Sequence, residues 1–381
     1  MSLTLGVLAR SRKPDEHRLA LHPRQLDRIP EELRGAVTFE AGYGKRFGVG
    51  DAEIAAAGVG VASREEVIAR ADVVVLPKPL VPDLEQLREG QVLWGWPHCV
   101  QDAPLTQAAI DRRLTLIAWE AMNHWSRNGS FELHVFHKNN ELAGYCSVSH
   151  ALQLVGRTGD YGRPLKAAVI SFGATARGAV RGLGALGVRD ITVLTQRDVA
   201  AVAAPFAAMR LVGFERDEDD PGRARVLTAD GESRPLVEEL AECDVIVNCV
   251  LQDTDQPLMF ITTEELAQLA PGTLVVDVSI DPGMGFGWAQ ATTFADPLAT
   301  VGDRVSYYAV DHSPSLLWDS ASWEIGAALL GHLPTVLAGP DAWEADATIR
   351  RAIEIQDGVV RNERILSFQD REQEYPHARR G

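Results

Sequence analysis

Four side chains able to bind a substrate or transfer a proton stand where an apolar stretch of this chain runs into a turn. Arg18, in EHRLALHP, follows the first such stretch, and a guanidinium there suits bidentate binding of a carboxylate. Lys78 stands between two prolines in LPKPL, which makes its segment extended and rigid. His98 ends GQVLWGWPH, and imidazole is the side chain best matched to proton transfer near neutral pH. Asp281 ends GTLVVDVSID, at the edge of a predicted sheet where ligands bind.

Each of these residues also has an ordinary structural explanation. Arg18 could be a surface arginine and Lys78 a solvated lysine, and Asp281 could simply begin a turn. Their order along the chain and their shared position at strand ends favour a functional site more strongly than any one of these residues does.

A second kind of site is predicted in the middle of the chain. Residues 167–187, AAVISFGATARGAVRGLGALG, predict a buried strand, a turn of small residues and a helix, which together offer a pyrophosphate free N–H groups and a helix dipole. Gly173 allows the backbone to approach phosphate, and Ala176 allows tight packing of helix on strand. Ser171 replaces the usual first glycine, which makes the turn less relaxed because a side chain is unfavourable at positive φ. The predicted cofactor turn comprises Ser171, Gly173, Ala174, Thr175 and Ala176.

The end of the next strand, ITVLTQRD, bears on the choice of cofactor. NAD enzymes usually place an acidic residue there to bind the ribose 2′-hydroxyl. Thr195 takes that position here, and after Gln196 comes Arg197, which could pair with a 2′-phosphate. The sequence therefore favours NADP(H). NAD(H) is the alternative if Asp198 supplies the missing carboxylate.

The elements that must hold these residues alternate between strand and helix. In the first 135 residues the strand candidates are TLGVLA, VTFEAG, VGVA, ADVVVLPK, GQVLWGW and LTLIAWEA, separated by helix-length segments, which predicts a mostly parallel sheet. A second series, ITVLT, CDVIVNCVL, GTLVVDVSI and VSYYAVDH, predicts a doubly wound nucleotide domain. From Pro314 the pattern turns helical, with a short strand pair around Asp357-Gly358. The polar tail DREQEYPHARRG is expected to be loosely ordered.

Composition narrows the classes of function. A length of 381 residues predicts about two to three domains. The net charge of −16 argues against nucleic acid or an anionic membrane as a partner. The N-terminus lacks a signal-peptide layout and no apolar run would span a bilayer, so we expect a cytoplasmic protein. No metal cluster is visible, and buried, reduced thiols are expected for Cys99, Cys146, Cys243 and Cys249.

The order of several motifs resembles a known family. GYGKRFGVGDAEI, WGWPH, LIAWEAM, HVFHKNNELAG, VIVNCVL, VDVSID and YYAVDHSPSL follow one another as in the alanine dehydrogenase, saccharopine dehydrogenase and transhydrogenase N-terminal superfamily. Within it the chain most resembles the N5-(carboxyethyl)ornithine synthases, as far as about residue 335. The resemblance implies an α/β fold of two Rossmann-like, doubly wound parallel-sheet domains with a cleft between them. Residues 1–135 and 316–381 would form the catalytic domain, and residues 136–315 the dinucleotide-binding domain.

The resemblance also implies a role for each candidate residue. Arg18 would hold the substrate carboxylate, Lys78 would lie beside the reacting carbonyl or imine, and His98 would act as acid and base. Asp281 would lie near the nicotinamide. The further implied cofactor contacts are Asn140 with Glu141, Val250, Leu251, Val310 and His312. The residues that could shape a larger amine pocket are Asp311, His312, Trp94 and Trp96, although tryptophans at strand ends more often belong to the core.

The reaction implied by the resemblance is a reduction at a C–N bond. An NADP-dependent oxidoreductase acting on CH–NH donors would condense a pyruvate-like 2-keto acid with the amine of an ornithine-like or lysine-like amino acid. The alternatives are reductive amination with ammonia, as in alanine dehydrogenase, and a saccharopine dehydrogenase-like activity. DPGMG weighs against simple alanine formation, since alanine dehydrogenases typically have a more glycine-rich turn there. A transhydrogenase-like nucleotide-binding subunit is a non-enzymatic alternative, against which Lys78 and His98 argue. A homo-oligomer, dimer or larger, is also implied.

Overall fold

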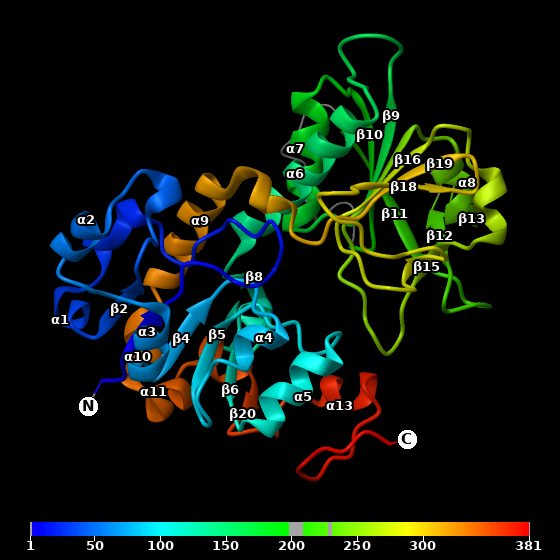
Figure 1. The fold of residues 1–381 in the computed structure, drawn as a ribbon. Coiled ribbons are helices and arrows are strands. Elements are labelled where there is room, and N and C mark those ends of the chain that lie inside the picture. The colour runs from blue at the N-terminus through cyan, green and yellow to red at the C-terminus, as the bar shows by residue number, and fades with distance from the viewer. Residues whose placement is uncertain (1, 198–208, 228–230, 381) are drawn as a thin grey trace. The chain divides into compact units, whose positions relative to one another are not determined.

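The computed structural model describes residues 2–197, 209–227 and 231–380, and it divides the chain into two compact units (Figure 1). Unit 1 comprises Met1–His137 and Leu317–Gly381, and unit 2 comprises Lys138–Leu316. The predicted boundaries after residues 135 and 315 lie within two residues of these divisions. Each unit is built on a mostly parallel sheet, which confirms the predicted α/β class with two Rossmann-like domains.

Unit 1 contains one large sheet and a separate hairpin. The sheet strands are β1 (Leu5–Val7), β2 (Val37–Glu40), β3 (Gly60–Ala62), β4 (Val73–Leu76), β5 (Val92–Gly95), β6 (Thr115–Ala118), β20 (Ile353–Gln356) and β21 (Val359–Val360), and the hairpin strands are β7 (Asn123–Trp125) and β8 (Phe131–His134). The α-helices are α1 (Glu31–Arg34), α2 (Asp51–Ala56), α3 (Arg64–Arg70), α4 (Val81–Leu84), α5 (Ala103–Asp111), α9 (Trp318–Leu330), α10 (Leu333–Ala338), α11 (Pro340–Ala345), α12 (Ala347–Ala352) and α13 (Glu363–Phe368).

The strand order of this sheet is β21-β20-β6-β5-β4-β1-β2-β3. Strands β1 to β6 are parallel, while β20 runs antiparallel to β6 and β21 antiparallel to β20. The order therefore reverses between β1 and β4. In open α/β sheets ligands bind at such a reversal, outside the carboxyl ends of the strands.

Both faces of the unit 1 sheet are covered by helices. Side chains alternate along a strand, so Val73 and Val75 of β4 lie in the core formed with α9, α10, α11 and α12. Val74 and Leu76 lie in the opposite core, formed with α3, α4, α5 and α13. Burial on both sides explains why these strands are continuous apolar runs rather than alternating ones.

The C-terminal segment of unit 1 is anchored by buried side chains, so the expectation of a loosely ordered tail is wrong. Arg371 is 3% exposed and His377 is 1% exposed. The Val360 N–H donates to Nε2 of His377 over 3.0 Å, and Arg371 donates to the side chain of Gln107 on α5 over 2.8 Å. The tail is polar in sequence, but two of its polar side chains, His377 and Arg371, bond to β21 and α5.

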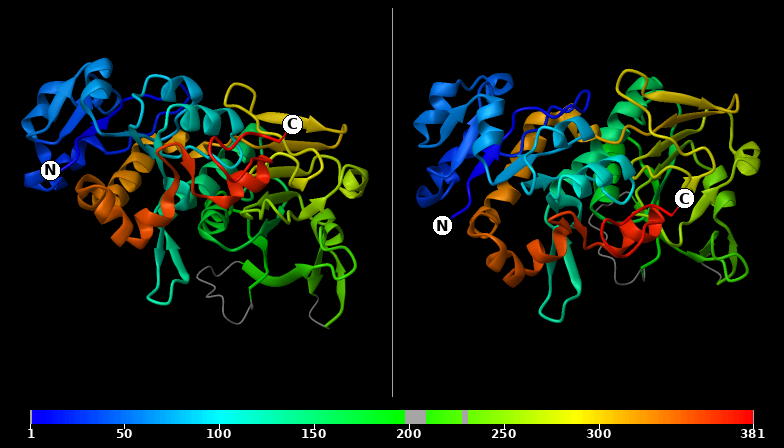
Figure 2. Two further views of the ribbon diagram at one scale, coloured as in Figure 1. Left: turned by 90° about the horizontal axis from the view of Figure 1, so that it is seen from below. Right: turned by 60° about the horizontal axis from the view of Figure 1, so that its bottom comes forward.

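The β7–β8 hairpin projects from the rest of unit 1 in both views of Figure 2. At its base the Arg351 guanidinium lies 4.1 Å from the centre of the Trp125 ring, and Thr348 donates to the Asn123 carbonyl. Helix α12 therefore holds the hairpin, which the strand pattern of the sequence did not predict.

Unit 2 is a second doubly wound domain. The main sheet holds β9 (Lys166–Ile170), β10 (Asp190–Thr195), β11 (Met209–Arg216), β12 (Ala224–Leu227), β13 (Ser233–Pro235), β14 (Val245–Asn248), β16 (Leu274–Asp277), β18 (Leu298–Val301) and β19 (Val305–Tyr308), and a small pair is formed by β15 (Met259–Ile261) and β17 (Gly285–Phe286). Its α-helices include α6 (His137–Leu154), α7 (Ala174–Ala185) and α8 (Leu236–Ala241). The order is β13-β12-β11-β10-β9-β14-β16-β19-β18, which reverses between β9 and β14.

Helices α6 and α7 cross at very close range. A Cβ added at Gly144 would lie 1.9 Å from the Thr175 carbonyl oxygen, and one added at Gly178 would lie 1.7 Å from the Glu141 carbonyl oxygen. Only glycine allows this approach. The Ala/Gly-rich helix after the predicted cofactor turn thus serves helix packing as well as the turn itself.

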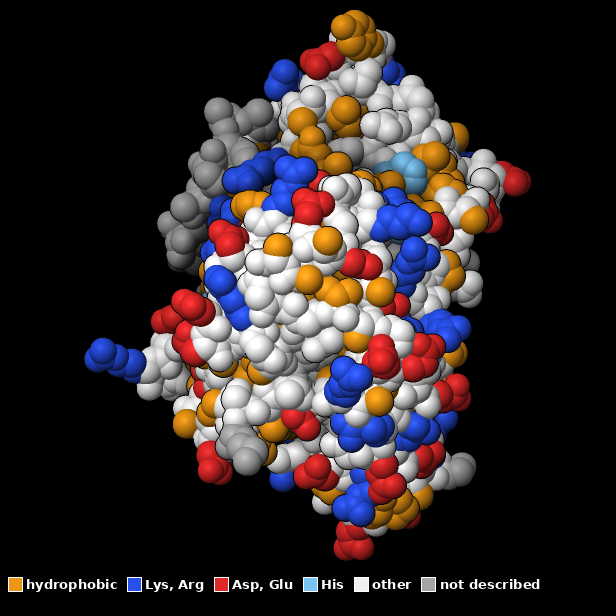
Figure 3. Space-filling view, turned by 60° about the vertical axis from the view of Figure 1, so that its left-hand side comes forward, with side chains coloured by type: hydrophobic (Ala, Val, Ile, Leu, Met, Phe, Trp, Pro, Cys, Tyr) orange, Lys and Arg blue, Asp and Glu red, His pale blue; other side chains and the backbone are white. Residues whose placement is uncertain are grey.

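The surface carries mixed charge. On the face drawn in Figure 3, Lys and Arg side chains are interspersed with Asp and Glu. Within the described residues, no helix is both long and apolar enough to cross a membrane.

Candidate active site

The carboxyl edge of the unit 1 sheet gathers the catalytic candidates. Arg18 lies in the loop after β1, Lys78 directly after β4 and His98 after β5. Glu120 follows β6 in a 3₁₀ turn. Because β1, β4, β5 and β6 are adjacent and parallel, the loops that follow them leave the sheet at the same edge.

Lys78 and His98 are in direct contact. The Lys78 Nζ lies 3.0 Å from Nε2 of His98. Gly95 makes the approach possible, since a Cβ there would lie 2.0 Å from the Leu76 carbonyl oxygen at the end of β4. His98 has φ of 49°, in the left-handed region that a side chain disfavours. Strained backbone of this kind persists only where the surrounding structure enforces it.

Glu120 lies beside His98 and was not predicted from the sequence. Its Oε1 accepts the His98 backbone N–H over 2.6 Å and lies 3.9 Å from Nδ1 of the imidazole. Burial raises the pKa of the Glu120 carboxyl well above its usual range, and the nearby Glu354 carboxylate raises it further. The motif LIAWEAM places Glu120 just after β6, as His98 comes after β5, and this position was the signal that could have identified it.

Arg18 is buried, at 5% exposed, so it is not an ordinary surface arginine. Its guanidinium makes a bidentate interaction with the Glu16 carboxylate, with Nε 2.8 Å from Oε1 and Nη2 2.5 Å from Oε2. It also lies 5.0 Å from the centre of the Trp96 ring. Trp94 and Trp96 are themselves buried and pack edge-on against Trp119, so both belong to the core.

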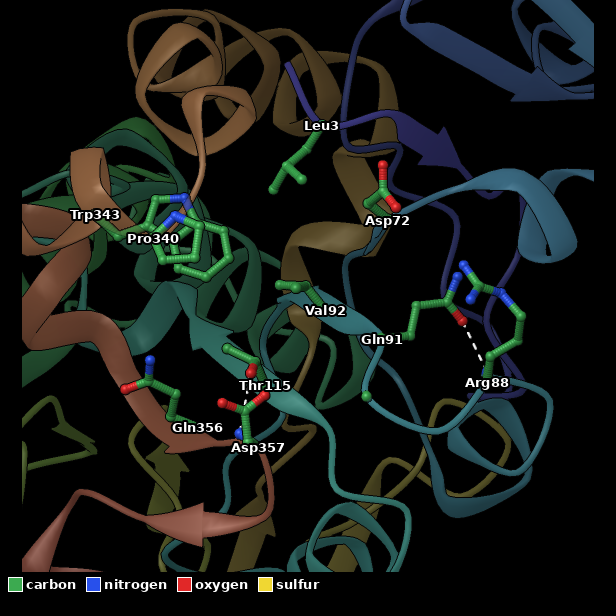
Figure 4. A pocket seen from close by; sticks show the side chains of 11 residues that line it. Leu3, Asp72, Arg88, Gln91, Val92, Thr115, Pro340, Trp343, Gln356 and Asp357 are labelled. Carbon is green, nitrogen blue, oxygen red and sulfur yellow. Dashed lines mark hydrogen bonds between the residues drawn. The ribbon is translucent and has the colours of Figure 1, made fainter. Parts of the chain in front are cut away.

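A cavity of about 240 Å³ lies at the opposite edge of the same sheet (Figure 4). It is lined by residues at the amino ends of β4, β5 and β6 and by the turn between β20 and β21. The Asp357 N–H donates to Thr115 Oγ1 over 3.1 Å, and Gln91 binds both the Arg88 N–H and the Ala71 carbonyl. These polar groups join the strand ends to each other, and the cavity is distinct from the Lys78–His98 edge.

The predicted cofactor turn in unit 2 has the geometry that a phosphate requires. Ser171 has φ of 87°, which confirms that a side chain at this position strains the turn. A Cβ added at Gly173 would meet nothing within 4 Å, so the protein leaves the space beside its backbone open. Helix α7 begins at Ala174, followed by Thr175, and the buried Ala176 packs in the core beneath it. The free N–H groups of this helix start would face a bound anion.

The end of β10 brings a cation to this turn. Thr195 is buried, and its Oγ1 accepts the Arg197 N–H over 3.1 Å. The exposed Arg197 side chain reaches back to donate to the Phe172 carbonyl over 2.5 Å. Gln196 is exposed beside it, and Asp198 lies outside the described residues. Arg177 lies over the Phe172 ring at 4.4 Å, a second cation that the sequence did not single out.

A buried polar network supports the loop after β14. The Val250 N–H donates to Asn248 Oδ1, and the Asn248 amide donates to Asp277 over 2.8 Å. Tyr307 donates to the other Asp277 oxygen over 2.7 Å. Burial raises the pKa of Asp277 to about 7. Leu251, next in the loop, is 87% exposed, and its predicted contact with the cofactor stays a prediction.

The remaining candidates of unit 2 lie in three places. Asp281 is half-buried in the turn after β16, and its charge further raises the pKa of Asp277. Lys78 and His98 belong to unit 1 and Asp281 to unit 2, and a shared site of these three residues stays a prediction. Val310 lies in the hydrophobic core, and the buried His312 has Nδ1 2.7 Å from Asp311 Oδ1.

Asn140 and Glu141 lie in the first turn of α6. Asn140 is half-buried there. Glu141 forms ion pairs with Arg181 of α7 at 2.7 Å and with Lys138 at 3.3 Å. The Glu141 side chain thus joins α6 to α7, and the predicted cofactor contact of this segment stays a prediction.

Comparison with known proteins identifies the family of this fold and site. The alanine dehydrogenase/PNT N-terminal domain matches residues 6–142, and the alanine dehydrogenase/PNT C-terminal domain matches residues 173–363, past the expected limit near residue 335. The N(5)-(carboxyethyl)ornithine synthase of Clostridium botulinum is 24% identical over 330 residues, which cover 84% of this chain and 90% of that protein. The alanine dehydrogenase of Mycolicibacterium smegmatis is 25% identical over 371 residues, 94% of this chain and 95% of that protein.

Solved structures show the same fold. An L-alanine dehydrogenase has a TM-score of 0.74 at 19% identity, covering 96% of this chain and 99% of that one. The transhydrogenase from Sinorhizobium meliloti has a TM-score of 0.71 at 22% identity, covering 94% and 99%. Since the two domain matches together span most of the sequence, the chain belongs to the alanine dehydrogenase/PNT family of oxidoreductases.

Proposed function

We propose that this protein is an NAD(P)H-dependent oxidoreductase that acts on a C–N bond. It condenses a pyruvate-like 2-keto acid with the amine of an ornithine-like or lysine-like amino acid, giving an N-(carboxyalkyl)amino acid. The observation that carries the proposal is the 3.0 Å contact between Lys78 and His98 at the ligand-binding edge of unit 1. A carboxyethylornithine synthase among the relatives supports the class of reaction.

The residues of unit 2 fit a nicotinamide nucleotide. The turn from Ser171 to Ala176 and the start of α7 would hold its pyrophosphate, with the open space at Gly173 admitting the phosphate oxygens. The exposed Leu251 would lie against its ring or base. When bound, this cofactor supplies the hydride that reduces the carbon of the C–N double bond.

The residues of unit 1 would bind the substrates and move protons. Arg18, whose orientation Glu16 fixes, presents a cation for the carboxylate of the keto acid. The Lys78 ammonium polarises the keto oxygen as the amine attacks. His98 removes a proton from the attacking nitrogen and returns one to the hydroxyl, which leaves as water. The backbone contact of His98 with Glu120 keeps the imidazole in place through both transfers.

We propose that NADP(H) is preferred over NAD(H). Arg197 reaches the cofactor turn through the Phe172 carbonyl, and Thr195 leaves the acidic position without a carboxylate. A guanidinium at this place stabilises a 2′-phosphate, whereas a ribose 2′-hydroxyl gains little from it.

Reductive amination with free ammonia is the second candidate. It is favoured by the alanine dehydrogenase relative, which matches 94% of this chain, more than the 84% matched by the synthase. The two reactions share the acid/base contact and differ only in the amine that is bound.

Small molecules are the proposed partners. The net charge of −16 opposes binding to nucleic acid and anionic membranes. We also propose a cytoplasmic homo-oligomer, which light scattering of the purified protein would test.

One experiment separates the two reactions. Oxidation of NADPH and of NADH is followed with pyruvate, 2-oxoglutarate or glyoxylate, each combined with ammonium, ornithine, lysine or arginine, and the products are identified by mass spectrometry. Turnover with pyruvate and ornithine or lysine, but not with ammonium, supports condensation. Turnover with ammonium alone establishes the second candidate, and no turnover with any pair overturns both.

A further inference from the structure

A β-bulge places one residue of the C-terminal strand β20 behind the acid/base site. In the pairing of β20 with β6, Ile353 faces Ile117 and Ile355 faces Leu116, so Glu354 is an extra residue without a partner on β6. A bulge redirects the side chain of the extra residue. Strand β6 runs on directly into the turn that carries Glu120.

Glu354 is buried, at 4% exposed, which is unusual for a glutamate. Its Oε1 accepts from Asn362 Nδ2 over 3.1 Å, and the buried Cys99 thiol is among the groups that lower the pKa of its carboxyl. Its Oε2 is buried and receives no hydrogen bond. Oε2 of Glu120 is buried in the same way, while Oε1 of Glu120 accepts the His98 N–H.

The charge of Glu354 acts on the Glu120 carboxyl. The negative charge of Glu354 raises the pKa of Glu120, in addition to the effect of burial. Burial also raises the pKa of Glu354. Of the titratable groups around the pair, Lys78 lowers the pKa of Glu120, and burial keeps Cys99 a neutral thiol by raising its pKa. Two carboxylates whose charges repel in a largely buried setting are costly to ionise together, and the cost is relieved when they share one proton.

We propose that Glu354 is a positioning residue of the acid/base site and that it shares a single proton with Glu120 through their two buried Oε2 atoms. The inference rests on the proposed roles of Lys78 and His98. It gives strand β20, which carries Glu354, a part in the chemistry of Lys78 and His98 in the loops after β4 and β5.

The shared proton sets the charge beneath His98. With one proton the pair carries a single negative charge, which orients the imidazole but leaves it able to give and take a proton. Loss of that proton would add a second negative charge and would favour the imidazolium form of His98. Glu354 therefore controls the pH range over which His98 can both accept and donate a proton, without touching substrate or cofactor.

The first test needs no turnover, so it stays informative even if the proposed reaction is wrong. Glutamate labelled with ¹³C at the side-chain carboxyl is incorporated, and the full-length protein is titrated by NMR. Two coupled carboxyl titrations above the ordinary glutamate range, near about 4.3, are expected. Glu354→Gln should remove one of these titrations and lower the pKa of the other. Glu363→Gln, which changes an exposed carboxyl of the same segment, should leave both titrations unchanged. Absence of any raised titration in the unmodified protein overturns the proposal.

The second test uses the pH profile of the active enzyme. Glu354→Gln keeps hydrogen-bonding capacity but cannot titrate, so the pH profile of kcat/KM should move by about one pH unit. Glu354→Asp, which restores a titrating group, should return the profile part of the way. A profile of Glu354→Gln that superimposes on that of the unmodified enzyme would mean that the role of Glu354 is structural only, and would overturn the proposal.

Discussion

The Lys78 Nζ lies 3.0 Å from Nε2 of His98, so only one of these two nitrogens can donate a hydrogen to the other. If the lysine is the ammonium, Nε2 presents its lone pair and the imidazole proton lies on Nδ1, toward Glu120. His98 would then begin the reaction as a base. Lys78 fixes this tautomer and at the same time keeps its positive charge beside the reacting oxygen.

Replacement of this histidine should stop the reaction without removing the cofactor. In His98→Ala we expect a loss of at least about 10²-fold in kcat, because the substitution removes the group that carries the proton. Binding of NADPH, measured by its fluorescence, should be unchanged, since the cofactor turn lies in unit 2. His124→Ala, an exposed histidine in the hairpin, serves as the control. Turnover of His98→Ala within threefold of normal, on the scale of such effects, would refute the assignment.

Cofactor preference should depend on Arg197. In Arg197→Ala the KM for NADPH should rise by about tenfold, because a charge-assisted contact to the 2′-phosphate is lost. The KM for NADH should change little. Arg189→Ala removes an exposed arginine elsewhere in unit 2 and should affect neither value. An unmodified enzyme that prefers NADH would contradict the proposed preference.

Ser171 should be a site of stored strain. Its φ of 87° disfavours any side chain, so Ser171→Gly should raise the free energy of unfolding by about 1 kcal/mol. Thermal and urea unfolding of the whole protein measure the change. Ser149→Gly, in the interior of α6, should instead lower stability by about 0.5 to 1 kcal/mol. A Ser171→Gly protein that is less stable than the unmodified one would show that the serine has a compensating contact.

Asp277 should make stability fall as pH rises toward neutrality. Its pKa is raised to about 7 in the folded protein, against about 3.9 in an unfolded chain. The stability that the protonated form contributes is therefore complete below about pH 4 and is lost as pH rises through 7, by roughly 2 to 4 kcal/mol. Asp277→Asn should remove this slope in urea unfolding between pH 5 and pH 8, whereas Glu218→Gln, an exposed carboxyl, should keep it. Equal slopes in Asp277→Asn and the unmodified protein would be inconsistent with the raised pKa.

The catalytic candidates found from the sequence were mainly those beside turn-forming residues at the end of an apolar strand. Prolines beside Lys78 and His98 signal where a buried strand ends, and strand ends are where parallel sheets place ligand contacts. Glu120 has apolar neighbours on both sides and no proline beside it, so only its position at the end of the strand LTLIA could have indicated it. Glu354 could not be predicted, because its place depends on antiparallel pairing with β6, a contact between segments far apart in the chain.

The same distinction holds for the fold. Apolar runs such as ADVVVLPK identified the strands because both faces of each sheet are buried. Polarity made the tail appear loose, but Arg371 and His377 are buried by specific hydrogen bonds that composition does not reveal. The order of the strands was not predicted, since periodicity alone does not determine which strands are neighbours.

The discontinuous layout of unit 1 has a consequence for its synthesis. Strands β20 and β21 are made after the whole of unit 2, so a chain leaving the ribosome completes unit 2 while the outer edge of β6 still lacks its neighbour. A bare strand edge invites pairing with other chains. Strands translated after unit 2 therefore cover a surface prone to aggregation, and a product truncated before β20 would keep that surface exposed.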